Sequence, residues 1–462
     1  WLKAGLEGGP ACLSSAVPEG GLPSRPPLLA RRPMILRALA LLLLATAAAP
    51  VRSALLANKE RRRLRSAPAG NRTTSDGKVL PLSVPDSETP IRVLISAFKD
   101  GERCANTLYR ALLQAEHPER VSFSVLQALG PGDVNCLEEF TFRQLPELCP
   151  EQACRRETLS RVHFWTIPRE EGKGPVHQRG LLSDRADLSG ESSMCLSIDS
   201  HMDFAEAWDR DLLEDWSATE NEFAVLTAYP QATWNGHRVG KRYWISLCGY
   251  FLQEGLPRGS TSVSMENGPE GGKPVLTMNW AAGQSFSRCH AERDVPPDKN
   301  LAWIFDGEEV NRAVRLWTHG YDLYNPSLSV ILHNYTAASQ EFWSYAPAGA
   351  GDAERLAGEA RLEKLLHGRT AAGEFGRYGL GDQRSLEDYV AWSHTDLGGQ
   401  WREFLLSRGF MPNLDGKTRK GDSEPESSPS FCEALERAPV RSAAELLARA
   451  RGGAEGGASA LA

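Results

Sequence analysis

Asp199 and His201 stand two positions apart, directly after an apolar run that begins at Met194 and predicts a buried strand. A carboxylate oxygen and an imidazole nitrogen both suit Mn2+ or a similar divalent ion, and positions i and i+2 at a turn can face one ion. An ion held in this way can neutralise the charge that grows on a diphosphate leaving group. The alternative is a capped turn before a helix, which we expect to begin near Phe204.

Two adjacent acids, Glu308 and Glu309, form the second candidate group. They follow Asp306 and Gly307 and open a pattern of apolar residues at helical spacing, at positions 310, 313, 314 and 317. Acidic side chains in the first turn of a helix are stabilised by the helix dipole, which is a sufficient structural reason for both.

The elements that must position these residues alternate between strands and helices. We expect strands at 91–98, 121–125, 163–167, 194–198 and 223–229, and helices within 105–113, 174–189 and 204–215. This order predicts an α/β fold with a mostly parallel central sheet and helices on both faces. Ligands of such sheets bind outside the carboxyl ends of the strands, where Asp199 lies. The sequence has neither a dinucleotide-binding glycine motif nor a P-loop.

Several sequence blocks, in order and at matching spacing, resemble glycosyltransferase family 60, the polypeptide N-acetylglucosaminyltransferases. The similarity extends from about Arg92 to about Leu397. The blocks are Gly174-Pro175 with Arg179, Ile198–Phe204 followed by Trp208-Asp209, Leu226–Pro230, Gly307–Glu309, Arg315–Tyr324 and Gly376–Gly381.

The resemblance implies a GT-A type nucleotide-sugar-binding domain with a metal at a D-x-D-like motif. The family is distantly similar to the mucin-type N-acetylgalactosaminyltransferases, whose motif is also D-x-H and whose third ligand is a late histidine. By this similarity the metal ligands are Asp199, His201 and His333. The implied cofactor is Mn2+ or another divalent ion, and the implied donor substrate is a UDP-sugar.

The family loop also implies that Glu308 or Glu309 orients hydroxyl groups of the acceptor or the sugar, so both are catalytic candidates. Arg179 is a candidate for binding the diphosphate or the sugar, because a guanidinium pairs well with phosphate oxygens. A structural ion pair is an equally good interpretation of this arginine. His319 is a substrate-site candidate as a packed histidine that shapes the site, with direct catalysis as the alternative.

Three further substrate-binding candidates follow from position in the expected fold. Ser96 and Asp100 lie at the end of the first strand, where the uridine should dock, and Asp133 follows the second strand.

The expected activity is transfer of N-acetylglucosamine from UDP-GlcNAc to a hydroxyl of an acceptor protein or glycoprotein, on Ser, Thr or hydroxyproline. The family implies retention of the anomeric configuration, and we assign no catalytic base. The alternatives are a transferase using another UDP-sugar and a pseudoenzyme that binds a nucleotide or glycan. Two departures from the family pattern leave these open: Gln178 replaces an alanine, and Asp203 replaces an arginine beside the metal motif. A metal-dependent hydrolase would need a water-activating base, and none is evident.

The rest of the chain predicts a secreted or membrane-anchored protein. We expect leader or gene-model excess at 1–33, a signal peptide or membrane anchor at 34–51, a flexible stem at 52–88, the GT-A domain at 89–415 and a disordered tail at 416–462. After Met34 the number of cysteines is eight, and this even number fits an oxidising compartment, for which we expect the Golgi lumen. A cytoplasmic location would follow if the apolar segment were not part of the real protein. The net charge of -7 and the lack of a basic, aromatic-rich face exclude a nucleic-acid partner.

Overall fold

The computed structural model describes residues 72–73, 79–238, 247, 249–253, 256–260, 272–336, 350–371, 373–395, 397 and 400–407. All of them belong to one compact unit, 69–462. The predicted leader, the signal peptide or anchor, most of the stem and the tail lie outside the described residues. Within the described part of the chain, no helix combines the length and the apolar character that crossing a membrane requires.

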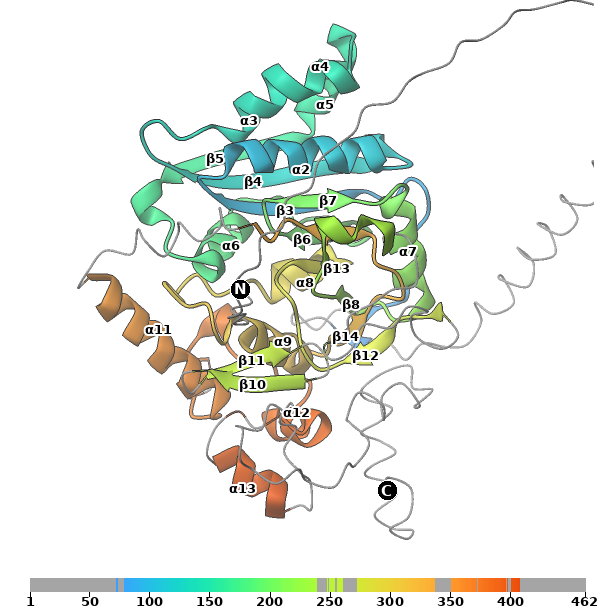
Figure 1. The fold of residues 1–462 in the computed structure, drawn as a ribbon. Helices are drawn as coiled ribbons and strands as arrows, with labels where there is room; N and C mark the ends of the chain where they lie inside the picture. The colour runs from blue at the N-terminus through green and yellow to red at the C-terminus, as the bar shows by residue number, and fades with distance from the viewer. Residues whose placement is uncertain are drawn as a thin grey trace, which may run out of the picture. The chain divides into compact units, whose positions relative to one another are not determined.

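An eight-stranded sheet forms the centre of the fold (Figure 1). In spatial order its strands are β12 (Val275–Thr277), β14 (Asp322–Asn325), β8 (Ala224–Thr227), β13 (Gln284–Arg288), β6 (Met194–Ile198), β3 (Ile91–Phe98), β4 (Val121–Leu129) and β5 (Val162–Pro168). Only β12 and β13 run against the other six. The predicted α/β class with a mostly parallel sheet is therefore confirmed.

Helices cover both faces of this sheet. Successive side chains of β3 point to opposite faces, and they enter two different cores. Val93 packs in one core with Leu108 of α2 (Gly101–Gln114). Its neighbour Leu94 packs in another core with Leu182 of α6 (Pro175–Ser183). This arrangement confirms the prediction of helices on both faces.

A second, three-stranded sheet lies beside the end of β6. It consists of β7 (Met202–Phe204), β15 (Ile331–His333) and β9 (Gln231–Ala232), with β15 in the middle. The predicted helix start at Phe204 is wrong, because Phe204 ends β7 and α7 (Trp208–Ala218) begins four residues later. Pairing with β15 explains the difference, since the backbone of Phe204 is opposite Ile331 in the ladder.

The second half of the domain packs around helix α9 (Glu308–Thr318). Trp317 of α9 lies in a core with residues of α11 (Ala350–Leu366), α12 (Leu386–Ser393) and α13 (Gln400–Ser407). The hairpin of β10 (Gly249–Gln253) and β11 (Leu256–Ser260) packs against the same helix. The other elements are β1 (Arg72–Thr73), β2 (Val79–Leu80), α3 (Cys136–Glu139), η2 (Phe140–Gln144), α4 (Leu145–Leu148), α5 (Gln152–Ser160), α8 (Cys289–Asp294) and the short helices η1 (Pro118–Arg120), η3 (Arg169–Glu171), η4 (Thr233–Arg238) and η7 (Gly376–Tyr378).

All six described cysteines are paired, in a pattern that the sequence could not provide. The pairs are Cys104–Cys136, Cys149–Cys154 and Cys195–Cys289. Cys248 and Cys432, which complete the predicted even set, lie outside the described residues.

The domain begins earlier than the predicted boundary at residue 89. Leu80 is buried in a core with Phe223 and Val225, and the backbone N–H of Ser83 donates a hydrogen bond of 2.9 Å to the Glu222 carboxylate. The last residues of the predicted stem, from Leu80 onward, therefore pack on the folded domain.

Candidate active site

The three predicted metal ligands meet at one point, although 132 residues separate His201 from His333. Asp199 directly follows β6, His201 lies in the turn before β7, and His333 ends β15, where it pairs with Met202 of β7. One ligand atom from each of the three side chains lies within 4.8 Å of the others. The Nε2 atom of His333 is 3.2 Å from a carboxylate oxygen of Asp199, and the two imidazole rings are 4.5 Å apart between centroids.

The protonation states of this group fit a divalent cation. Burial lowers the pKa of His333, which favours the neutral imidazole that binds metals. Burial alone would raise the pKa of Asp199, but the hydrogen bond with His333 and the positive charge of Arg179 hold it well below its ordinary value. One carboxylate and two imidazoles form a donor set suited to Mn2+ and related ions. The Nδ1 atom of His333 is also buried with no hydrogen-bond partner among the described residues.

Asp100 contacts the imidazole ring of His201. One of its carboxylate oxygens is 2.9 Å from His201 Nδ1 and accepts a 2.8 Å hydrogen bond from the Ser200 hydroxyl. Its other oxygen accepts from Arg103 at 2.5 Å. Because Nδ1 of His201 faces this carboxylate, Nε2 is the nitrogen left for an ion. The structure therefore gives Asp100 a place in the support of the histidine, whereas its expected contact with uridine stays a prediction.

Arg179 connects the metal candidates to helix α9. Its Nη2 atom is 2.5 Å from Asp199 and its Nη1 atom is 2.5 Å from Glu308. The arginine side chain is only 6% exposed, so both ion pairs are shielded from water. Burial raises the pKa of Glu308 despite the adjacent guanidinium. The structure thus shows the ion pair that the sequence offered as the alternative for Arg179; contact with a diphosphate stays a prediction.

Glu309 has a different environment from its neighbour. It accepts a hydrogen bond from the Tyr229 hydroxyl, and burial raises its pKa to about 8, so it is largely protonated at neutral pH. Gly307, with φ of 91°, caps this end of α9, and a β-carbon there would lie 2.3 Å from Leu362. Tyr229 was not among the predicted site residues, although its position at the end of the predicted strand 223–229 was a usable signal.

His319 is not brought to this site. It caps the opposite end of α9, where its ring nitrogen Nδ1 lies 2.7 Å from the carbonyl of Arg315. A helix of this length separates it from Glu308 by roughly 15 Å. The structure therefore shows His319 as a packed histidine at the end of α9, and a part in shaping the substrate site stays a prediction.

The two remaining candidates lie at the carboxyl ends of the first strands, as predicted. Ser96 is the third residue from the end of β3 and is opposite Leu126 of β4. Asp133 follows β4, and its carboxylate binds Arg169 at 2.5 Å and accepts from the backbone of Gly130 at 2.8 Å. This ion pair joins the loops that follow β4 and β5. Contact of Ser96 or Asp133 with uridine stays a prediction.

Both departures from the family pattern have structural partners. The Gln178 side chain donates hydrogen bonds to the carbonyls of Ala97 at 2.6 Å and Leu126 at 3.1 Å. Asp203 forms a 2.6 Å ion pair with Arg110 of α2. Neither side chain belongs to the ligand cluster, so the substitutions leave the donor set of the metal candidate intact.

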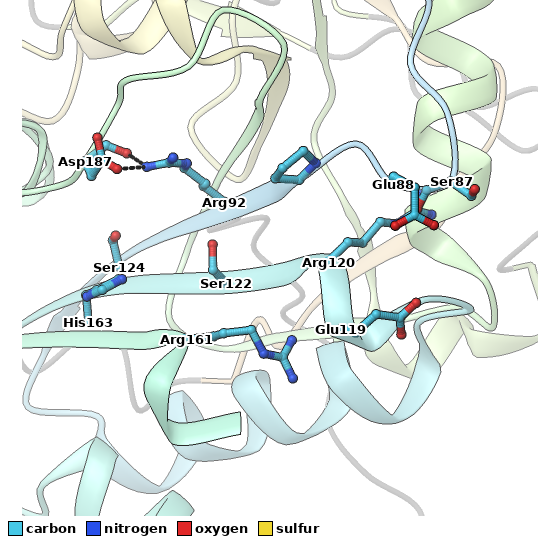
Figure 2. A pocket seen from close by; sticks show the side chains of 11 residues that line it. Ser87, Glu88, Arg92, Glu119, Arg120, Ser122, Ser124, Arg161, His163 and Asp187 are labelled. Carbon is cyan, nitrogen blue, oxygen red and sulfur yellow. Dashed lines mark hydrogen bonds and ion pairs between the residues drawn. The ribbon is translucent and has the colours of Figure 1, made fainter. Parts of the chain in front are cut away.

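A hollow of about 370 Å³ lies at the opposite end of the strands (Figure 2). It is lined by Arg92, Ser122 and His163, which are each the second residue of their strand. Figure 2 shows the Arg92 guanidinium bound to Asp187 at one side of this hollow. Because ligands of parallel sheets bind at the carboxyl ends, the cluster at Asp199 is the better candidate for the active site.

The comparison with protein families identifies a sugar transferase. A model of the family described as Glycosyltransferase (GlcNAc) matches residues 140–398. No curated protein matches the chain.

Three solved structures show distant similarity. GalNAc-T7 with UDP, GalNAc and Mn2+ is 13% identical, with a TM-score of 0.42, over 70% of this chain and 55% of that one. The mannosyltransferase PcManGT from Pyrobaculum calidifontis with GDP-Man and Mn2+ is 10% identical, with a TM-score of 0.35, over 79% and 90%. S. aureus TarS 1-349 with UDP-GlcNAc is 9% identical, with a TM-score of 0.38, over 66% and 71%. The matched part thus spans just over half the length of the first of these structures.

Proposed function

The chain belongs to the glycosyltransferase (GlcNAc) family, whose model matches more than half of its residues, and from this premise we propose that it transfers N-acetylglucosamine from UDP-GlcNAc to a hydroxyl of an acceptor protein. The observation that carries the proposal is the convergence of Asp199, His201 and His333 beside the carboxyl end of β6. The candidate acceptor residues are Ser, Thr and hydroxyproline, and the acceptor can be a protein or a glycoprotein.

The same three side chains would hold a divalent metal ion, for which we propose Mn2+. When bound, the ion supplies positive charge to the diphosphate leaving group. The protein's own contribution is to keep Asp199 ionised and His333 neutral, and to fix His201 through Asp100. These groups are preorganised, which is how electrostatic stabilisation of a leaving group becomes effective.

We propose that Glu308 and Glu309 position hydroxyl groups of the sugar or acceptor. Glu308 is held by Arg179, so its orientation is fixed relative to Asp199. Glu309 is protonated at neutral pH and can therefore donate a hydrogen bond as well as accept one. We propose transfer with retention of the anomeric configuration and assign no base, so the rate would come from positioning and leaving-group stabilisation.

Two alternatives remain as outcomes of the test. The first is transfer of another sugar from its UDP donor. The second is binding of a nucleotide or glycan without turnover. The intact ligand cluster, and the engagement of Gln178 and Asp203 elsewhere, support a working transferase over a binding protein.

The test is release of UDP from a panel of nucleotide sugars by the purified protein, with and without Mn2+. Release that requires Mn2+ and occurs only with UDP-GlcNAc would support the transferase activity, the Mn2+ requirement and UDP-GlcNAc as the donor. Release with a different UDP-sugar would correct the donor. Tight, Mn2+-dependent binding of UDP without release from any donor, in the presence of a pooled peptide acceptor, would favour the binding protein.

We also propose that the domain works in the secretory pathway, with the Golgi lumen as its site. The three disulfides among the described residues support an oxidising compartment. The sequon at Asn71 lies outside the described residues, and a glycosidase-sensitive shift in mass at this position would support lumenal exposure. An unmodified protein with reduced cysteines in cells would contradict it.

A further inference from the structure

Two exposed aromatic side chains lie beside the candidate metal ligands. Trp234 is 65% exposed and Tyr335 is 41% exposed, which is unusual for large aromatic residues inside a folded domain. Their rings are 6.3 Å apart between centroids and inclined by 62°. We call this pair the aromatic corner. Neither residue has a role in the reaction as proposed so far.

The pairing of two short strands explains why these residues meet. β9 and β15 run parallel, and Ala232 is opposite His333 in the ladder. Trp234 and Tyr335 each stand two positions further along, so the chain carries both beyond the same end of the small sheet. The register that delivers His333 to the metal candidates therefore also builds the aromatic corner.

The corner is held in a fixed position relative to the site. The Tyr335 ring packs on the His333 imidazole, with centroids 3.9 Å apart. Its hydroxyl donates a 2.9 Å hydrogen bond to the carbonyl of Pro230. A single ring, that of Tyr335, thus separates Trp234 from the candidate metal ligand His333. Most of the Trp234 side chain is exposed to solvent.

The position of the corner favours an acceptor over the nucleotide. The parallel strands β3 and β4, beside which a nucleotide is expected, belong to the central sheet, whereas β9 belongs to the small sheet. Among the described strands, β9 is also one of the two edge strands of the small sheet. A polypeptide that brings a hydroxyl to the metal candidates can therefore continue along this edge.

The inclination of the rings indicates the chemistry of the occupant. A sugar ring stacks on one flat aromatic face, whereas two rings in edge contact at 62° present an angled apolar surface. Aromatic surfaces of this kind recognise proline-containing segments, because the proline ring is apolar, bulky and conformationally fixed. We propose that the aromatic corner of Trp234 and Tyr335 binds a proline-containing segment of the acceptor polypeptide, next to the residue that is modified.

This proposal rests on the proposed function, so its test must separate the two. The probe is a library of synthetic peptides with a central Thr, Ser or hydroxyproline and randomised flanking positions. The full chain, with UDP and Mn2+, is used to capture peptides, and transfer from UDP-GlcNAc to the captured peptides is measured separately. The variants are Trp234→Ala and the matched control Phe142→Ala, since Phe142 is a 76% exposed aromatic residue in η2, which packs on α2.

We expect the wild-type protein and Phe142→Ala to select proline at one or two fixed flanking positions. Trp234→Ala should lose this selection and raise the KM for a selected peptide by about tenfold or more, with a smaller effect on kcat, because a central aromatic anchor dominates binding. Its affinity for UDP with Mn2+ should remain that of the wild type, which also shows that it folds. Tyr335→Phe, which keeps the ring, should retain the selection.

Each other outcome has a definite meaning. Transfer by the wild type without a preference for proline at flanking positions would overturn the proposed role of the aromatic corner, and so would an unchanged preference in Trp234→Ala. The transferase function would stand in both cases. Proline-selective capture without transfer from any UDP-sugar would sink the proposed function and support the corner as a binding site.

Discussion

The Nδ1 atom of His201 lies 2.9 Å from a carboxylate oxygen of Asp100, although the two residues are 101 positions apart in the sequence. Asp100 caps α2 and His201 precedes β7, which packs against that helix. A carboxylate in this position fixes both the tautomer and the orientation of an imidazole that binds a metal.

Replacing Asp100 with Asn should weaken Mn2+ binding without removing a ligand. We expect a loss of about 10- to 100-fold in affinity, the usual effect of removing the carboxylate behind a ligating histidine. Titration of the protein with Mn2+ in the presence of UDP measures it. Asp187→Asn is the matched control, because this carboxylate also pairs with an arginine but is 62% exposed at the other end of the sheet. Equal affinities of Asp100→Asn and the control would contradict the supporting role.

Replacing His333 with Ala should abolish metal-dependent turnover and leave the fold intact. Loss of a ligand should lower the Mn2+-dependent release of UDP on the order of a hundredfold or more, since stabilisation of the leaving group is lost. The same loss of UDP release is expected for Asp199→Ala. His163→Ala, at the exposed start of β5, serves as control. A His333 variant that unfolds, as judged by circular dichroism, or one that stays active, would count against the metal assignment.

Much of the framework that holds the site could be predicted from local sequence. Strands 91–98 and 194–198 were predicted with their observed bounds, because buried strands of a parallel sheet appear as continuous apolar runs between turn residues. Asp199 could be placed at a strand end for the same reason. Strands β7 and β15 have only three residues each, too few to show a period, so their pairing could not be predicted.

Contacts between side chains that are far apart in the sequence also could not be predicted from local sequence patterns. The position of His333 was implied by family similarity, whereas the structure supplies the register that brings it to His201. The placement of Asp100 behind His201 depends on the packing of α2 against β7. His319 lies in a block that resembles the family, and the structure places this residue at the far end of α9 from Glu308.

Replacing Arg179 with Met should destabilise the domain strongly. Two carboxylates, those of Asp199 and Glu308, would lose their shared cation in a shielded environment. Removing one partner of a buried ion pair typically costs about 3–5 kcal/mol in the free energy of unfolding, which urea denaturation measures. Arg92→Met is the control, because its partner Asp187 is 62% exposed and the pair should contribute about 1 kcal/mol or less. Similar losses for both variants would show that the bridge adds no special stability. Because Mn2+ would compete with Arg179 for Asp199, the measurement belongs in metal-free buffer.

Glu309 should make the stability of the domain fall as the pH rises. Burial raises its pKa from the ordinary value of 4.5 to about 8 in the folded protein. Between these values the folded protein holds a proton that the unfolded chain releases, so the free energy of unfolding decreases with increasing pH. The full contribution is present below pH 4.5 and is lost as the pH approaches about 8.

The Glu309→Gln variant cannot release this proton, so its stability relative to the wild type should increase from pH 5 to pH 8, as measured by the urea midpoint. Glu354→Gln is the matched control. The Lys173 partner lowers the pKa of Glu354, so that carboxylate is already ionised throughout this window and its stability difference from the wild type should stay constant. Parallel stability curves for Glu309→Gln and the wild type would mean that the carboxyl of Glu309 is ionised in the folded protein, and that it cannot donate a hydrogen bond to a sugar hydroxyl at neutral pH.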